Sequence, residues 1–304
     1  MLLVLVAALA VGLAVWLASR GALGPKPEAT PPGSSEPRTT ANSAERKRTH
    51  PEPPKLTAPK PKATRPAPTT AGALPGKATV ARIGLVIDDL GRSLEEVSRL
   101  AALGVPVAGA VLPFEKETPQ VAAALAQDRR EILLHLPMDP EGGANPGPGA
   151  LTEDMSPEQL ALTTRKALAQ VPGSVGVNNH MGSRLSADEN AMRTVLSVIA
   201  ERQLFFLDSR TSAESVAYRT ARRLGMAAAE RQVFLDPDRH PAEIHTQWSR
   251  LLSLARERGA AIAIGHPYAE TFELLAQEIP KARAAGFEFV PVSYLMDSPG
   301  APPE

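Results

Sequence analysis

The 304-residue chain contains no cysteine, which excludes disulfide scaffolds, thiolate metal centres and cysteine nucleophiles. Aromatic residues make up only 4% of the sequence, which argues against a surface that stacks nucleic-acid bases. Neither sign of charge is in excess, because 33 Lys and Arg balance 33 Asp and Glu. A globally basic nucleic-acid binder is therefore disfavoured, and we expect no nucleic-acid partner. Serine-hydrolase and nucleotide-binding functions are also disfavoured, because no G-x-S-x-G, Walker or dinucleotide motif lies between a strand and a helix.

Residues 2–18 form an apolar run without a charged side chain. A helix of about 17 residues spans roughly 26 Å, which is near the thickness of a bilayer core. We therefore expect residues 1–20 to contain a membrane anchor. The alternative is a cleaved signal peptide, but no basic residue precedes the apolar run and the best small-residue cleavage site is followed directly by Pro25.

The next segment, residues 21–80, has the composition of a linker. It contains thirteen prolines and ten Lys or Arg against four Asp or Glu, with few large apolar side chains. Such a segment buries too little surface to offset the entropy of ordering, so we expect an extended, disordered linker. Residues 81–304 carry 22 basic and 29 acidic residues, a difference of −7. We expect an acidic folded domain at 81–298 and a short tail at 299–304.

Short apolar runs alternate with helical segments throughout the expected domain. Continuous Val, Ile and Leu runs are typical of strands that are buried on both faces. Helix starts are expected at Ser93, at Thr118 and Ser156 as caps before prolines, and at Pro241. The repeat of roughly 30 residues predicts a parallel sheet with helices outside, most simply a (β/α) barrel. The strands are expected at residues 83–87, 107–112, 131–134, 174–177, 204–207, 233–235, 261–264 and 287–292.

Polar or titratable side chains follow most of these predicted strands. In a barrel the carboxyl ends of the strands converge on one face, so these residues should gather in one pocket although they are far apart in sequence. They are Asp88, Asp89, His135, His180, Asp208, Asp236 and His266.

Aspartates and neutral imidazoles are the ligands that zinc, or another borderline divalent metal, prefers when no thiolate is present. Two histidines and one aspartate leave a coordination position open for water, whose pKa the metal lowers. A further aspartate can take a proton from that water, and a further histidine can protonate a leaving group. The residue set thus predicts a metal-assisted hydrolase.

Each candidate also has a structural explanation. The pair Asp88 and Asp89 can form a turn or cap a helix, and His135 can be a core imidazole bonded to a backbone carbonyl. Asp208 and Asp236 can satisfy backbone amides at strand ends. The prediction of a metal-assisted hydrolase therefore depends on the joint pattern of the residues.

Six ordered motifs carry a resemblance to a known family. They are IDDLG (87–91), LHLPM (134–138), NNHMGS (178–183), FLDSRT (206–211), VFLD (233–236) and IGHP (264–267). Together they resemble the divergent polysaccharide deacetylase family of bacterial envelope proteins, over about residues 80–297. The resemblance implies a distorted (β/α) barrel with about seven parallel strands, and hydrolysis of N- or O-acetyl groups with a divalent metal.

The resemblance also implies residue roles. Asp88 matches the general base, Asp89 a metal ligand and His266 the general acid. Asp208, one of the residues at the strand ends, is a further catalytic candidate that this resemblance does not assign. Ordinary polysaccharide deacetylases bring two histidines from one H-x-x-x-H segment, which in this chain runs from His135 to Asp139 and lacks the second histidine.

Either Asp139 or His180 can therefore complete a metal site with Asp89 and His135. We prefer His180, because a neutral imidazole limits charge crowding beside the two aspartates, and zinc is the expected metal. The usual catalytic Arg-Pro motif is absent, and Arg184 or Arg210 can provide a cation in its place.

These expectations describe a periplasmic metal-dependent deacetylase, anchored in the inner membrane through residues 2–18, that acts on an envelope or extracellular polysaccharide or another acetylated saccharide. The alternative function is a non-catalytic, membrane-tethered barrel that binds a glycan or an envelope protein. If the apolar segment is cleaved, the protein is secreted instead of anchored.

Overall fold

Nine strands form one sheet in the computed structural model, which describes residues 80–297. All the strand pairs are parallel. The order is β6-β5-β4-β3-β2-β1-β8-β7, and β9 pairs with β1. The strands are β1 (Arg82–Leu90), β2 (Ala108–Val111), β3 (Ile132–Met138), β4 (Gly176–Met181), β5 (Phe205–Asp208), β6 (Ala228–Glu230), β7 (Val233–Phe234), β8 (Ala260–Gly265) and β9 (Glu288–Phe289).

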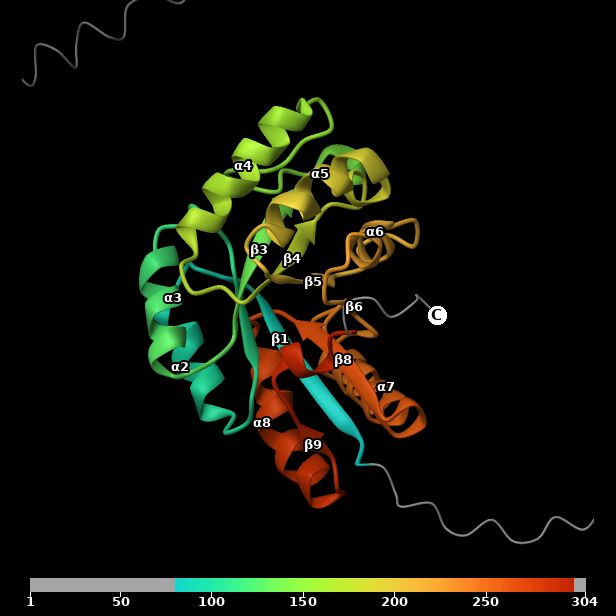
Figure 1. Ribbon diagram of the computed structural model, residues 1–304. Coiled ribbons are helices and arrows are strands. Elements are labelled where there is room, and N and C mark those ends of the chain that lie inside the picture. The colour runs from blue at the N-terminus through green and yellow to red at the C-terminus, as the bar shows by residue number, and fades with distance from the viewer. Residues whose placement is uncertain (1–79, 298–304) are drawn as a thin grey trace, which may run out of the picture. The chain divides into compact units, whose positions relative to one another are not determined.

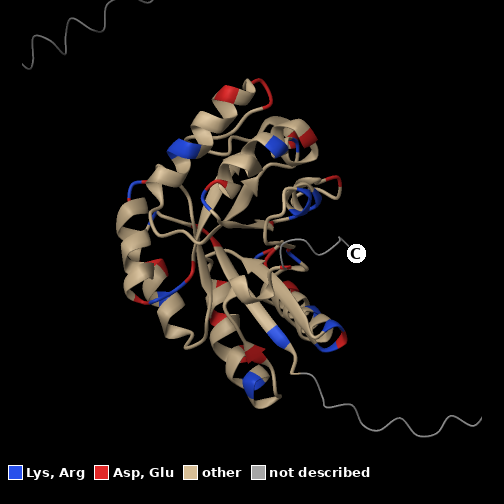
Figure 2. Cartoon of the chain, viewed as in Figure 1, with Lys and Arg blue, Asp and Glu red and all other residues tan. Residues whose placement is uncertain are grey.

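Helices surround the strands on the outside (Figure 1). They connect successive strands except β6 and β7, so most of the chain repeats the strand–helix unit that the sequence predicts. Charged residues of both signs lie mainly on these helices and on the connecting segments (Figure 2). The α-helices are α2 (Leu94–Ala102), α3 (Thr118–Gln127), α4 (Pro157–Gln170), α5 (Glu189–Ala200), α6 (Ala217–Arg223), α7 (Pro241–Arg258) and α8 (Ala269–Ala284), and the 3₁₀ helices are η1 (Glu141–Gly143), η2 (Leu185–Ala187) and η3 (Val292–Leu295).

The barrel is distorted because the sheet does not close. Strands β6 and β7 are its two edges, and no ladder joins them within residues 80–297. Between them, Gln232 bonds to β8 through both its backbone and its side chain. Its backbone N–H donates to the Ile262 carbonyl (3.0 Å), and its Oε1 accepts from the Ile262 N–H (2.7 Å). The parallel α/β barrel predicted from the sequence is confirmed, with a seam at this position.

Alternation along the strands separates two apolar layers. In β1, Val86 belongs to a small cluster inside the barrel, whereas Leu85 and Ile87 pack in the larger cluster with the helices. Leu133 in β3 and Leu207 in β5 also belong to the inner cluster. Side chains two residues further along each strand point to the same side, which decides which polar residues face the barrel mouth.

The helix-start predictions hold at two of the three capping residues. Ser93 accepts a hydrogen bond from the Glu95 N–H (3.1 Å), and Ser156 forms a capping box with Gln159. The prediction for Thr118 is wrong, because Thr118 lies inside the first turn of α3 and Glu117 holds the cap position. Thr118 instead donates to the Leu112 carbonyl (2.7 Å), which ties the start of α3 to the end of β2.

The N-terminal predictions concern residues that the structure does not describe. The anchor expected at 2–18, the linker and the tail fall within residues 1–79 and 298–304, outside the described part. In residues 80–297, no helix has the length and apolar character that crossing a membrane requires.

Candidate metal and catalytic site

A cleft of about 430 Å³ opens at the carboxyl ends of the strands. Five of the seven residues predicted to gather there line it, although they come from four different strands or strand ends. They are Asp88, Asp89, His135, His180 and His266. Asp208 and Asp236 do not line the cleft, and each has a different environment, described below.

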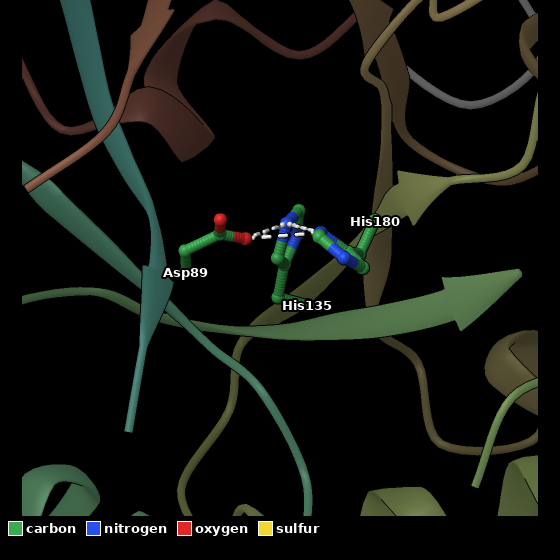
Figure 3. Close-up of side chains that lie close together, drawn as sticks. All are labelled: Asp89, His135 and His180. Carbon is green, nitrogen blue, oxygen red and sulfur yellow. Dashed lines mark hydrogen bonds and ion pairs between the residues drawn. The ribbon is translucent and has the colours of Figure 1, made fainter. Parts of the chain in front are cut away.

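Three side chains in the cleft converge on one point (Figure 3). Asp89 Oδ1 lies 2.9 Å from His180 Nδ1 and 3.2 Å from His135 Nε2, and the two ring nitrogens are 3.1 Å apart. Among the described residues, these three side chains form the group that can place three ligand atoms within 4.8 Å of one another. Asp139 is not part of it.

The spacing of these atoms fits a bound metal. A tetrahedral zinc ion with bonds of about 2.0 Å places its ligand atoms roughly 3.3 Å apart. Asp89 Oδ1 is also buried and has no hydrogen-bond partner of regular geometry among residues 80–297. A bond to a metal would satisfy this oxygen. Two imidazole nitrogens and a carboxylate oxygen form a donor set suited to zinc, and they leave room for a fourth ligand.

Asp89 and His135 shift each other's pKa toward the charged form. Burial opposes ionisation of Asp89, but the adjacent rings of His135 and His180 outweigh burial and lower the pKa of this carboxyl. Burial alone would lower the pKa of His135, but the carboxylates of Asp88 and Asp89 outweigh it and raise that pKa. Asp89 and His135 thus each favour the charged form of the other.

A β-bulge explains why two consecutive strand residues both reach the cleft. In a regular strand, neighbouring side chains point to opposite faces. The register between β1 and β2 shifts between Ile87 and Leu90, and Asp89 has a left-handed backbone with φ of 59°. Such a bulge re-aims one side chain, so Asp88 and Asp89 both face the barrel mouth.

A glycine fixes the backbone that carries His180. Gly182 has φ of +88°, and a Cβ at this position would lie 2.7 Å from Cβ of Met138. The backbone after β4 thus passes against the end of β3 at a distance that only glycine permits.

Asp88 lies beside the group formed by Asp89, His135 and His180 but is not a member of it. Its side chain is buried, and its Oδ1 accepts a hydrogen bond from Asn178 Nδ2 (2.8 Å). Burial raises the pKa of Asp88, and the positive charges of His135 and His266 act in the opposite direction. A carboxyl with a raised pKa next to a metal site suits a proton acceptor.

Asp236 does not line the cleft, but it fixes the position of His266 by hydrogen bonds. Its Oδ1 lies 2.9 Å from His266 Nδ1, and its Oδ2 accepts from the His266 N–H and the Thr271 hydroxyl (both 2.7 Å). Burial alone would lower the pKa of His266, but Asp236 outweighs it and raises the pKa. With Nδ1 held by Asp236, Nε2 is the ring nitrogen that can act in the cleft.

Asp208 points away from the cleft, toward α6. It lies on the same face of β5 as Phe206, which packs in the outer apolar cluster. Its carboxylate accepts from the Arg210 N–H (2.8 Å), the Ser215 hydroxyl (2.7 Å) and the Tyr218 N–H (3.2 Å). These contacts order the segment between β5 and α6.

The cleft also contains Arg231, a cation that no sequence motif indicates. Arg231 donates through Nε to the Ser209 carbonyl (2.6 Å) and through Nη2 to the Arg210 carbonyl (2.9 Å), and its guanidinium lies 4.7 Å from the centre of the Phe234 ring. Burial lowers its pKa, against the attraction of Asp88. Of the two predicted cations, Arg210 lines the cleft and pairs with Glu230, whereas Arg184 pairs with Glu153 outside it.

Comparison with known proteins identifies the family. The profile of the family described as divergent polysaccharide deacetylase matches residues 85–296. The chain belongs to this family. The resemblance drawn from the six sequence motifs is therefore confirmed.

Three similar proteins are each named as uncharacterized. YibQ of Escherichia coli (strain K12) is 33% identical over 207 residues, which cover 68% of this chain and 65% of YibQ. A protein of Haemophilus influenzae (strain ATCC 51907 / DSM 11121 / KW20 / Rd) is 34% identical over 194 residues, which cover 64% of this chain and 69% of the relative. The crystal structure of ATU2773 from Agrobacterium tumefaciens C58 matches with a TM-score of 0.67 at 27% identity, over 72% of this chain and 90% of ATU2773.

Proposed function

We propose that this chain is a metal-dependent deacetylase that hydrolyses acetyl groups on an envelope or extracellular polysaccharide. The observation that carries the proposal is the convergence of Asp89 Oδ1, His135 Nε2 and His180 Nδ1, at 2.9 to 3.2 Å from one another, in a cleft that also holds Asp88 and His266. Membership of the divergent polysaccharide deacetylase family supports the same reaction class.

The cleft residues have two kinds of role: some are metal ligands, and the others accept or donate protons. A divalent metal, for which zinc is the best match, would be held by Asp89, His135 and His180 and would supply Lewis-acid polarisation of a carbonyl oxygen or a water. Asp88 is left free of this set, and it accepts a proton as water attacks the acetyl carbonyl carbon.

His266 completes the reaction on the other side of the scissile bond. Its Nε2 donates a proton to the departing amine nitrogen or alcohol oxygen as the C–N or C–O bond breaks, so the products are acetate and the deacetylated sugar. The rings of Phe234 and Tyr268 each lie 5.4 Å from the His266 ring, and they limit water access to this imidazole.

The location of the protein in the cell forms part of the proposal. The apolar run at residues 2–18 supports attachment to the inner membrane, with the domain in the periplasm, where envelope polysaccharides are accessible. Cell fractionation and protease accessibility of a tagged chain test this location. Recovery of the full-length chain in the cytoplasmic soluble fraction would contradict it.

Acetate release is the direct test of the activity. Purified full-length protein, loaded with zinc, is incubated with acetylated saccharides, and acetate is measured with and without a chelator. We expect chelator-sensitive release from at least one acetylated polysaccharide. A zinc-loaded protein that releases no acetate from N-acetylated or O-acetylated substrates would contradict the proposal and favour the non-catalytic, glycan- or protein-binding alternative.

A further inference from the structure

One buried amide connects the two functional halves of the cleft. Asn178 is fully buried, and the register of the sheet places it directly beside His135 on the neighbouring strand. Its Nδ2 donates to Asp88 Oδ1 (2.8 Å) and to Ser209 Oγ (3.3 Å), and its Oδ1 lies 3.0 Å from His135 Nδ1. All three hydrogen-bonding groups of this side chain are therefore used.

The orientation of the amide follows from the chemistry of its neighbours. A carboxylate only accepts hydrogen bonds, so Asp88 must face the NH₂ group of Asn178. The carbonyl oxygen then faces His135, and this oxygen can only accept. His135 Nδ1 must therefore carry a proton, which leaves the lone pair of a neutral ring on Nε2, the atom that points at Asp89 and His180.

We propose that Asn178 is a positioning residue that fixes the metal-binding tautomer of His135 and, at the same time, the orientation of the proton acceptor Asp88. The second half of this role rests on the proposed deacetylase function, whereas the first concerns metal binding alone. A hydrogen bond to the remote nitrogen of a ligand histidine orients the ring and strengthens the metal bond.

Two substitutions separate the two contacts. Asn178→Leu removes the hydrogen bonds to His135, Asp88 and Ser209 at similar volume. Asn178→Asp keeps an oxygen facing His135 but replaces the NH₂ group that faces Asp88, so two carboxyl groups meet there. Thr164→Val is the matched control, because Thr164 is fully buried with one hydrogen bond to the Leu160 carbonyl, on α4 and away from the cleft.

The experiment has three readouts on the full-length protein. Nitrogen-15 NMR of the metal-free protein, at a pH high enough to deprotonate the imidazolium, reports which ring nitrogen of neutral His135 keeps its proton. Zinc titration reports the dissociation constant, and acetate release reports kcat and KM separately. In the unsubstituted protein we expect His135 to carry its proton on Nδ1.

For Asn178→Leu we expect a mixture of tautomers and roughly 10–100-fold weaker zinc binding. For Asn178→Asp we expect the Nδ1–H tautomer and zinc binding to be retained while kcat falls with little change in KM. Thr164→Val should match the unsubstituted protein in the tautomer and zinc readouts.

Results on the tautomer of His135 or on zinc affinity can overturn the proposal. An Nε2–H tautomer of His135 in the unsubstituted protein would do so even if Asn178→Leu failed to fold. Unchanged zinc affinity in Asn178→Leu, or equal losses of zinc in the Leu and Asp variants, would also overturn it. Absence of acetate release from every substrate would sink the proposed function but not the role of Asn178 in metal binding, which the tautomer and zinc readouts test on their own.

Discussion

Asp236 holds His266 through both of its carboxylate oxygens, one on the ring Nδ1 at 2.9 Å and the other on the backbone N–H at 2.7 Å. The ring is thus fixed in orientation and favoured in its protonated form. Because Asp236 itself does not line the cleft, its effect on the reaction acts through His266.

The pH dependence of acetate release should reflect this pair. Asp236 raises the pKa of His266 above the ordinary value of 6.5, so the proton donor stays charged to a higher pH than an unperturbed histidine, and activity falls as His266 deprotonates. In Asp236→Asn the carboxylate is lost, so the pKa of His266 falls and the alkaline limb of the pH–rate profile moves to lower pH. An unmoved limb in this variant would contradict the assignment of His266 as the acid.

The same shift predicts a pH dependence of stability. A histidine with a raised pKa in the folded state stabilises the fold fully below pH 6.5, and this contribution is lost as the pH rises through the folded-state pKa. Urea unfolding across this pH window should therefore show a decrease that is smaller in Asp236→Asn than in the unsubstituted protein. Equal decreases in the two proteins would mean that the pair adds no pH-dependent stability.

Asp88 and Asp89 are neighbours in sequence with different expected roles. Asp88→Asn should lower the rate of acetate release by roughly 10²–10⁴-fold, because a general base is lost, while zinc binding is largely retained. Asp89→Asn should lower zinc affinity sharply, because a ligand is lost. Zinc titration and acetate release on both variants test this division. Equal zinc loss in the two variants would show that Asp88 is also a ligand.

Asp208 was a catalytic candidate from sequence, and its contacts in the structure predict a stabilising role. Asp208→Asn should lower the free energy of unfolding by about 2 kcal/mol, because a buried carboxylate that accepts from Arg210, Ser215 and Tyr218 is replaced by a group with one acceptor. Activity per folded molecule should change little. A large loss of activity at unchanged stability would support the catalytic assignment instead.

Gly182 and Gly286 form a matched pair for testing the His180 segment, since both have φ of +88°. Gly286→Ala meets no atom within 4 Å, so it should cost only about 1 kcal/mol of backbone strain and leave zinc binding unchanged. Gly182→Ala must also push against Met138, which displaces the backbone next to His180 and should weaken zinc binding. Equal zinc affinity in the two variants would contradict this account.

The sequence predicted the barrel well because buried parallel strands are read directly from apolar runs. It missed β6, whose segment is rich in alanine and therefore carries little strand signal. It also extended the last strand too far, because the ladder of β9 ends at Phe289 and Pro291, which lacks a backbone N–H, follows closely.

Prediction of the site was more uneven, for local structural reasons. Strand alternation would have placed Asp208 on the outer face with Phe206, and this signal was available in the sequence. In contrast, the β-bulge that brings both Asp88 and Asp89 into the cleft breaks the alternation and cannot be read from it. Arg231 was missed because the irregular backbone at the barrel seam, not a motif, brings it to the cleft.

The proposed deacetylase function depends on Asp89, His135 and His180 holding one divalent metal together. The most direct measurement is anomalous scattering at the zinc edge from crystals of the protein grown with zinc. We expect one strong peak within bonding distance of Asp89 Oδ1, His135 Nε2 and His180 Nδ1, with a fourth position facing the cleft. A zinc-containing crystal in which these three side chains carry no peak would contradict it.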